Sequence, residues 1–240
     1  MKKVIFIVFI ITILSCFTSK ELVSNTDTNT DDENTNPKET TLNILSLGDS
    51  YTVGHSVCET CRFPEQLKQS LNSSFDTQYM FDLKVIAQTG WTTTNLINAI
   101  ASENITNNND LVTLLIGVNN QYQGKPFSLY ETEFPDLVQT AITAANGDKS
   151  NVVVVSIPDY GYTPFGQKNM ETISSEIDAY NNFAETYCEQ NNITYLYITD
   201  ITRQGLENTA LVASDGLHPS ELAYAKFVER ILPLAIEKIE

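Results

Sequence analysis

Five short apolar runs most constrain what this chain can fold into. They are rich in residues branched at Cβ and cover residues 42–47, 81–87, 111–116, 152–157 and 193–198. Two of them, within "DLVTLLIG" and "NVVVVSIP", are continuously rather than alternately hydrophobic. This pattern is typical of strands that are buried on both faces, as in a parallel sheet.

Helical patterns lie between and after these runs, over residues 64–71, 93–101, 135–145, 174–190 and 219–239. Alternation of strands and helices predicts an α/β fold, in which helices cover a parallel sheet on both sides. Ligands of an open parallel sheet bind beyond the carboxyl ends of its strands. A functional site is therefore expected in the loops that follow the strands.

Small and polar residues occupy four of these loops. The first strand ends in Gly48-Asp49-Ser50, the second is followed by "AQTGWTT" with Gly90, and the third by "GVNNQYQG" with Asn119. The segment "SDGLHPS", which contains His218, precedes the last helix. We expect all four segments to lie on one rim of the sheet.

The N-terminus has the features of an export signal. Lys2 and Lys3 precede an apolar run over residues 4–14, which is too short to span a bilayer. The following "ILSC" resembles the lipobox of bacterial lipoproteins, which implies cleavage after residue 15 and lipidation of Cys16. We therefore expect an exported cell-envelope lipoprotein that Cys16 anchors in a membrane, with an ordinary signal peptide as the alternative.

Residues 16–41 form a polar segment rich in Thr, Asn and Asp. Such a segment cannot bury enough apolar surface to fold, so we interpret it as a flexible acidic linker behind the lipidated cysteine. The remaining residues, 42–240, are enough for one domain with its own hydrophobic core.

The chain is strongly acidic, with a formal net charge of −16. This charge argues against a nucleic-acid partner, because phosphate binding needs clustered Lys and Arg. It favours a neutral substrate.

Three cysteines follow Cys16. Cys58 and Cys61 could close a small disulfide loop, because export would make a disulfide possible. Cys188 falls on the apolar face of a predicted helix, and we interpret it as a core residue. No metal site is expected, because the chain has two histidines and lacks a second Cys pair.

Nucleophilic catalysis by a serine needs a base, an acid that orients the base, and donors for an oxyanion. Asp215 precedes His218 by three residues, a spacing that lets the acid bond Nδ1 and leaves Nε2 facing outward. His55 has no acid at such a spacing, so we interpret it as a surface-loop histidine. Asp49 is adjacent to Ser50, and we assign it to capping the backbone of the turn.

The ordered set "GDSY", Gly90, "GVNN" and "DGLHP" resembles the SGNH, or GDSL-type, hydrolase family of esterases and lipases. The resemblance runs from about residue 43 to the end of the chain. It implies a flavodoxin-like, three-layer α/β/α fold with a parallel five-stranded sheet, and hydrolysis of esters without a metal or other cofactor. The sequence departs from the family pattern at Tyr51, where leucine is usual, and at Asn120, where aspartate is common.

The resemblance also implies roles for individual residues. Ser50 would be the nucleophile, His218 the base and Asp215 the acid that orients it. Gly90 and Asn119 would form the oxyanion hole together with the backbone N–H of Ser50. The reaction would be attack of Ser50 on an acyl ester to give an acyl-enzyme, which water then hydrolyses.

The substrate is less constrained than the reaction. Trp91, Tyr122 and Tyr160 follow predicted strands and could stack on a sugar or line an acyl pocket, or merely pack loops onto the sheet. We expect a small-molecule or glycan ester, with carbohydrate and lipid esters of acetate or other acids all open. Two alternatives are an acyltransferase with the same catalytic residues and a catalytically silent surface lipoprotein that binds a glycan or another partner.

Overall fold

The computed structural model describes residues 40–76 and 78–239. The predicted signal peptide, the lipidation site Cys16 and the linker up to residue 39 lie outside these described residues. Thr40 and Thr41, predicted to end the linker, are the first residues of a strand and pair with Tyr79 and Met80.

A five-stranded parallel sheet forms the centre of the described domain. Its strands are β1 (Thr40–Gly48), β2 (Tyr79–Ala87), β3 (Leu111–Leu115), β4 (Val152–Val155) and β5 (Thr194–Leu196). They lie in the order β2-β1-β3-β4-β5, and every pairing is parallel. The predicted fold class is confirmed.

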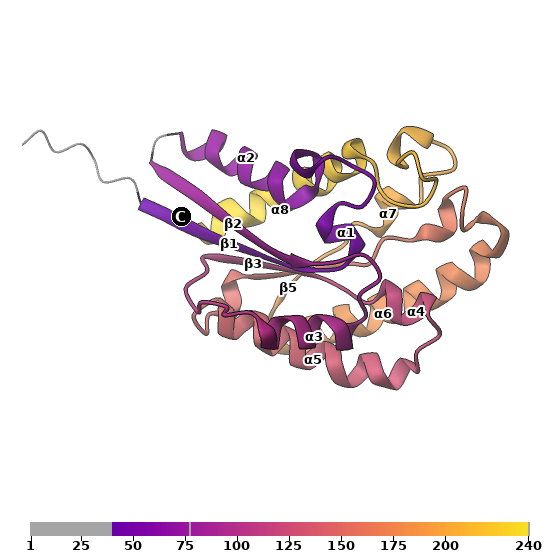
Figure 1. The fold of residues 1–240 in the computed structure, drawn as a ribbon, viewed down its shortest axis with the longest axis horizontal. Helices are drawn as coiled ribbons and strands as arrows, with labels where there is room; N and C mark the ends of the chain where they lie inside the picture. Colours follow the sequence, from indigo (N-terminus) through magenta and orange to yellow (C-terminus); the bar gives the residue numbers. More distant parts are fainter. Residues whose placement is uncertain (1–39, 77, 240) are drawn as a thin grey trace, which may run out of the picture. The chain divides into compact units, whose positions relative to one another are not determined.

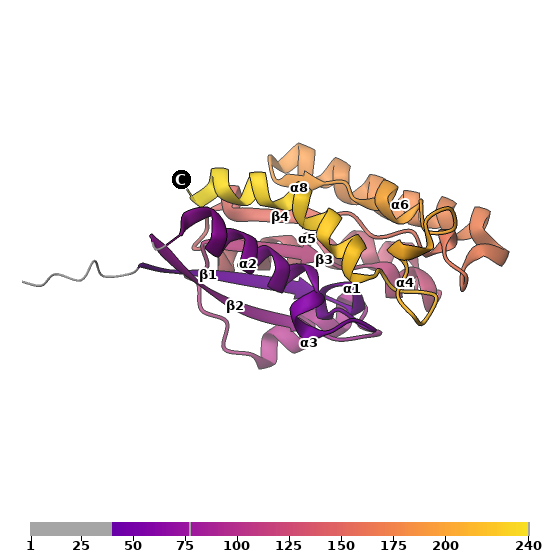
Figure 2. The same cartoon turned by 90° about the horizontal axis from the view of Figure 1, so that it is seen from above.

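Helices cover both faces of the sheet (Figures 1 and 2). One face carries α2 (Phe63–Phe75) and α8 (Glu221–Ile239), which pack against each other. The other face carries α3 (Thr93–Ser102), α5 (Phe127–Ala144) and α6 (Met170–Asn191). Within the described residues, no helix is both long and apolar enough to cross a membrane.

The inner strands are buried on both faces, as their composition predicts. All five residues of β3 and all four of β4 are buried, and so are the last five residues of β1. Helices lie above and below these buried stretches, so their side chains are shielded from water on both faces of the sheet.

The helix α5 is longer than the sequence pattern predicts. It begins at Phe127, eight residues before Pro135, and Pro135 lies inside it. The added turns bring Phe127 and Tyr130 against Tyr180 of α6, with ring centroids 4.9 and 4.6 Å away. This packing stabilises a segment whose local sequence is a weak helix signal.

The strand order reverses at β1. The chain leaves β1 for β2 on one side, and β3 follows on the other side of β1. Ligands of open α/β sheets bind outside the carboxyl ends of strands at such a reversal. The short helices α1 (Ser50–Val53) and α4 (Val118–Tyr122) begin there, just after β1 and β3.

Candidate active site

The turn between β1 and α1 presents Ser50. Gly48 has to be glycine, because a Cβ there would lie 2.4 Å from the carbonyl oxygen of Leu115 on the neighbouring strand. Asp49 caps α1, and its Oδ1 accepts a hydrogen bond from the Tyr51 N–H at 3.0 Å. Ser50 is the first residue of the helix, so its own N–H has no partner within the helix.

Asp49 is completely buried beside Ser50. Burial raises its pKa to about 7, although the hydrogen bond from the Tyr51 N–H acts in the opposite direction. Its Oδ2 has no hydrogen-bond partner among the described residues. The capping bond agrees with the structural role expected from the sequence, and the burial shows that this cap costs stability when it is ionised.

The raised pKa predicts how an Asp49→Asn variant behaves. Between pH 4 and pH 7 the unfolded chain ionises Asp49 while the folded protein keeps it protonated, so the free energy of unfolding falls as pH rises. At pH 8 this ionisation lowers the free energy of unfolding by about 4 kcal/mol relative to pH 4. Asparagine is neutral, so the variant should be more stable than the wild type at pH 8 and similar to it at pH 4.

Denaturant unfolding at pH 4, 6 and 8 measures this difference. Asp136→Asn, which changes an exposed acid on α5, is the matched control and should leave the pH dependence unaltered. Parallel stability curves for the wild type and Asp49→Asn would contradict the expectation.

Asp215 holds His218 through both carboxylate oxygens. Oδ1 accepts hydrogen bonds from the backbone N–H groups of Leu217 and His218, at 2.9 and 3.0 Å. Oδ2 lies 2.6 Å from Nδ1 of His218. Although partial burial raises the pKa of Asp215, hydrogen bonds from Ser56 and His218 hold it well below its ordinary value. The carboxylate is therefore ionised at neutral pH.

His218 is buried, and its ring lies edge-on to that of Tyr51, with centroids 5.8 Å apart. Burial lowers its pKa, whereas the hydrogen bond and charge of Asp215 raise it and the neighbouring His55 lowers it. The lowered pKa leaves the imidazole mostly neutral at pH 7, so it can accept a proton.

Ser50 and His218 line the same cavity. In the described part of the chain, no hydrogen bond joins the Ser50 hydroxyl to the His218 ring. Such bonds are often loose in free enzymes and tighten when substrate binds.

Three residues that line the cavity carry potential hydrogen-bond donors, which are the backbone N–H groups of Ser50 and Gly90 and the side-chain amide of Asn119. Gly90 adopts φ +86°, a left-handed conformation suited to glycine, and its carbonyl accepts a bond of 2.8 Å from the Gln123 side chain. Asn119 donates one amide hydrogen to the Trp91 carbonyl at 3.0 Å, which leaves its second amide hydrogen available. With the N–H of Ser50, these groups could bind an oxyanion.

Asn120, where the sequence departs from the family pattern, is fully buried. Its Oδ1 accepts from the Thr93 N–H at 2.9 Å, and its Nδ2 donates to the Thr93 hydroxyl at 2.6 Å. These bonds join α4 to the first turn of α3. The asparagine therefore supports the short helix α4, which carries Asn119.

The cavity has a volume of about 230 Å³. Its lining residues come from loops at the carboxyl ends of the strands: Ser50, Tyr51, Thr89, Gly90, Val118, Asn119, Tyr122, Tyr160, Phe165, Leu217 and His218. Tyr122 and Phe165 are exposed at its mouth, and their ring centroids lie 6.2 Å apart. Trp91, also predicted to contact substrate, is half-buried against the core and does not line the cavity.

The sequence analysis missed two further residues beside the cavity. His55 is exposed, as expected, but its ring centroid lies 4.6 Å from that of His218, and its Nδ1 lies 3.0 Å from the Thr89 hydroxyl. Ser56 donates a hydrogen bond of 2.6 Å to Asp215 Oδ2. No spacing in the sequence indicates these contacts, because the loop 54–62 reaches them from the other end of the chain.

The structure joins Cys58 and Cys61 in a disulfide, whose Cα atoms lie 4.9 Å apart, and Cys188 is a buried free thiol.

His55, Asp215 and His218 place one metal-ligand atom each within 4.8 Å of one another. The Asp215 carboxylate, however, already accepts four hydrogen bonds, from Leu217, from Ser56 and twice from His218. The lone pairs of the Asp215 carboxylate are therefore used in hydrogen bonds within the protein and are not free to coordinate a metal.

Solved structures share this fold. Axe2, an acetylxylan esterase from Geobacillus stearothermophilus, is 15% identical, with a TM-score of 0.61 over 82% of this chain and 95% of that one. The lipase/acylhydrolase from Enterococcus faecalis is 18% identical, with a TM-score of 0.61 over 80% of this chain and 94% of that one. The psychrotrophic esterase EstA from Pseudoalteromonas sp. is 18% identical, with a TM-score of 0.56 over 82% of this chain and 97% of that one.

Sequence comparison with curated proteins finds no match. The model of the GDSL-like Lipase/Acylhydrolase family, by contrast, matches residues 46–226, which contain the turn with Ser50 and the segment with Asp215 and His218. Because this match spans most of the chain, the protein belongs to the GDSL-like lipase/acylhydrolase family, as its sequence motifs suggest.

Proposed function

We propose that this protein is a serine esterase that hydrolyses acyl esters through an acyl-enzyme on Ser50. One observation carries the proposal: Ser50, His218, Gly90 and Asn119 line a single cavity although they come from four separate segments of the chain. Family membership supports ester hydrolysis as the reaction.

The reaction begins when the Ser50 hydroxyl attacks the ester carbonyl and His218 Nε2 takes its proton. The N–H groups of Ser50 and Gly90 and the carboxamide of Asn119 bind the oxyanion that forms. Asp215 keeps the proton of His218 on Nδ1 and stabilises the imidazolium. His218 then protonates the leaving alcohol and activates the water that hydrolyses the acyl-enzyme.

The lining and the volume of the cavity favour a neutral ester with a short acyl group as the substrate. Within the described residues its lining contains no Asp, Glu, Lys or Arg, so it offers no fixed charge to an ionic substrate. Its volume of about 230 Å³ is below the usual range for drug-sized ligands. We infer acetyl or similarly short acyl esters of carbohydrates or lipids, with Tyr122 and Tyr160 against the substrate and Trp91 acting indirectly by holding Asn119.

We also infer that the protein works outside the cytoplasm, anchored to the cell envelope through Cys16. The disulfide between Cys58 and Cys61 supports export, because such bonds persist in oxidising compartments. The acidic composition supports a partner that is not a nucleic acid.

A fluorophosphonate probe and a panel of esters test the proposed function together. The probe should label the wild type on the peptide that contains Ser50, as read by mass spectrometry. Acetylated glycans and short nitrophenyl esters should be hydrolysed faster than long-chain lysophospholipids. A protein that neither reacts with the probe nor hydrolyses any ester would support a binding function instead.

A further inference from the structure

The disulfide loop, residues 54–62, connects α1 to α2 and reaches the catalytic acid. Its Ser56 donates a hydrogen bond of 2.6 Å to Asp215 Oδ2, across 159 positions of sequence. The same oxygen lies 2.6 Å from Nδ1 of His218. Ser56 therefore shares one carboxylate oxygen with the predicted base without itself lining the cavity.

Ser56 adopts a backbone conformation that serine rarely takes. Its φ is +69°, in the left-handed region that costs a residue with a Cβ some conformational energy. Such strain persists only where surrounding contacts impose it, and it concentrates at functional sites. The strained backbone and the hydrogen bond to Asp215 occur at the same residue.

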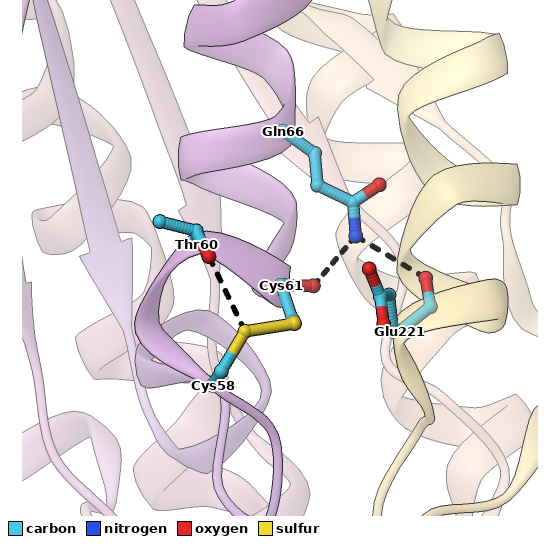
Figure 3. The surroundings of a disulfide bond; sticks show 5 residues. All are labelled: Cys58, Thr60, Cys61, Gln66 and Glu221. Atoms are coloured by element: carbon cyan, nitrogen blue, oxygen red, sulfur yellow. Dashed lines mark hydrogen bonds between the residues drawn. A yellow bond between two sulfur atoms is a disulfide. The ribbon is translucent and has the colours of Figure 1, made fainter.

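The loop is fixed to the helical layer that carries the catalytic turn. The disulfide between Cys58 and Cys61 closes its far end (Figure 3). Gln66 of α2 then donates to the carbonyl of Cys61 at 2.6 Å and to that of Glu221, the first residue of α8, at 3.2 Å. The turn with Asp215 and His218 leads directly into α8, so the loop and the turn share one support.

We propose that Ser56 is a positioning residue, held in place by the disulfide loop, that orients Asp215 and through it His218. The inference rests on the proposed function, because it assigns Ser56 a role in the same proton transfer. The Ser56 hydroxyl fixes which lone pair of Oδ2 faces the imidazole. Without it, water replaces the donor, and the carboxylate can turn away from the geometry that transfer requires.

Ser56→Gly removes the hydroxyl and relieves the strain in one change, since glycine adopts φ +69° freely. The expected result in the full-length protein is a fall in kcat of roughly tenfold on a nitrophenyl acetate, with KM unchanged within about twofold. The melting temperature should stay the same or rise. A role in stability alone would instead lower the melting temperature and leave kcat intact.

A double-mutant cycle shows whether Ser56 acts through Asp215. In an Asp215→Asn background, Ser56→Gly should change kcat by less than about twofold, because the carboxylate that it orients is gone. An equal loss in both backgrounds, or no loss in either, would overturn the proposal. Ser73→Ala, which removes an exposed hydroxyl bonded to the backbone of α2, is the control and should behave as the wild type.

The experiments distinguish failure of the positioning role of Ser56 from failure of the proposed esterase function. Activity that survives Ser50→Ala would refute the serine mechanism itself. Loss of activity in Ser50→Ala with full activity in Ser56→Gly would refute only the positioning role.

Discussion

Ser50→Ala should lower kcat on a nitrophenyl acetate by at least about 10⁴-fold while the protein stays folded. The substitution removes the only atom proposed to form the acyl-enzyme, and the remaining oxyanion donors and cavity can supply just a residual rate. Ser50 is the first residue of α1 and alanine is a good helix former, so the melting temperature should move by no more than about 2 °C. Initial rates and a thermal melt on the same preparation measure both.

The control for this variant is Ser74→Ala. Ser74 also lies in a helix, where its exposed hydroxyl bonds the carbonyl of Ser70, and it does not line the cavity. It should keep wild-type kcat. If Ser50→Ala retained more than about a hundredth of the wild-type kcat without a trace of contaminating esterase, another group would have to be the nucleophile.

Asp215→Asn should lower kcat by roughly 10³ to 10⁴-fold, because the equivalent change in a known Ser-His-Asp triad has an effect of about this size. The asparagine Oδ1 can still accept from the backbone of Leu217 and His218, so the turn should hold. Its amide, however, presents N–H groups to Nδ1 of His218 and favours the tautomer with the proton on Nε2. That tautomer cannot take a proton from Ser50.

The pH profile of kcat/KM gives a second readout of the same variant. The hydrogen bond and charge of Asp215 raise the pKa of His218 against the effect of burial. Removing the charge should lower that pKa, so the acid limb of the profile should move to lower pH. A loss of less than tenfold in kcat, or an acid limb that moves to higher pH, would contradict the role of Asp215.

The strands were predictable because their signal is local. The runs that contain Leu111–Leu115 and Val152–Val155 are continuously apolar, which is typical of strands buried on both faces, and the structure buries every residue of both strands. The structure confirms five parallel strands, with ends that differ from the prediction by at most two residues. Helix starts were less predictable, because Phe127 and Tyr130 join α5 through contacts with α6 rather than through local sequence.

In the candidate site, too, some contacts are predictable from local sequence and others arise only in the folded protein. The pairing of Asp215 with His218 spans three residues, so a turn of known geometry brings them together and the spacing alone suggests it. His55 is a different case: it has no acid three residues before it, which favoured an ordinary surface-loop residue, yet the fold brings its ring beside that of His218. Trp91 lies next to Gly90, and only the packing shows that it faces the core instead of the cavity.

The sequence by itself determined the α/β class, the parallel sheet, the family and the loops that carry Ser50, Gly90, Asn119 and His218. The fold class and the sheet follow from the hydrophobic pattern, which acts within a few residues of chain. The family and its site loops follow from short motifs that resemble those of the GDSL family. Only the tertiary structure decided the shape of the cavity, the aromatic residues at its mouth and the contact of Ser56 with Asp215. Those features join segments that are distant in the sequence, by 159 positions for Ser56 and Asp215, and their geometry depends on the packing of the layers between them.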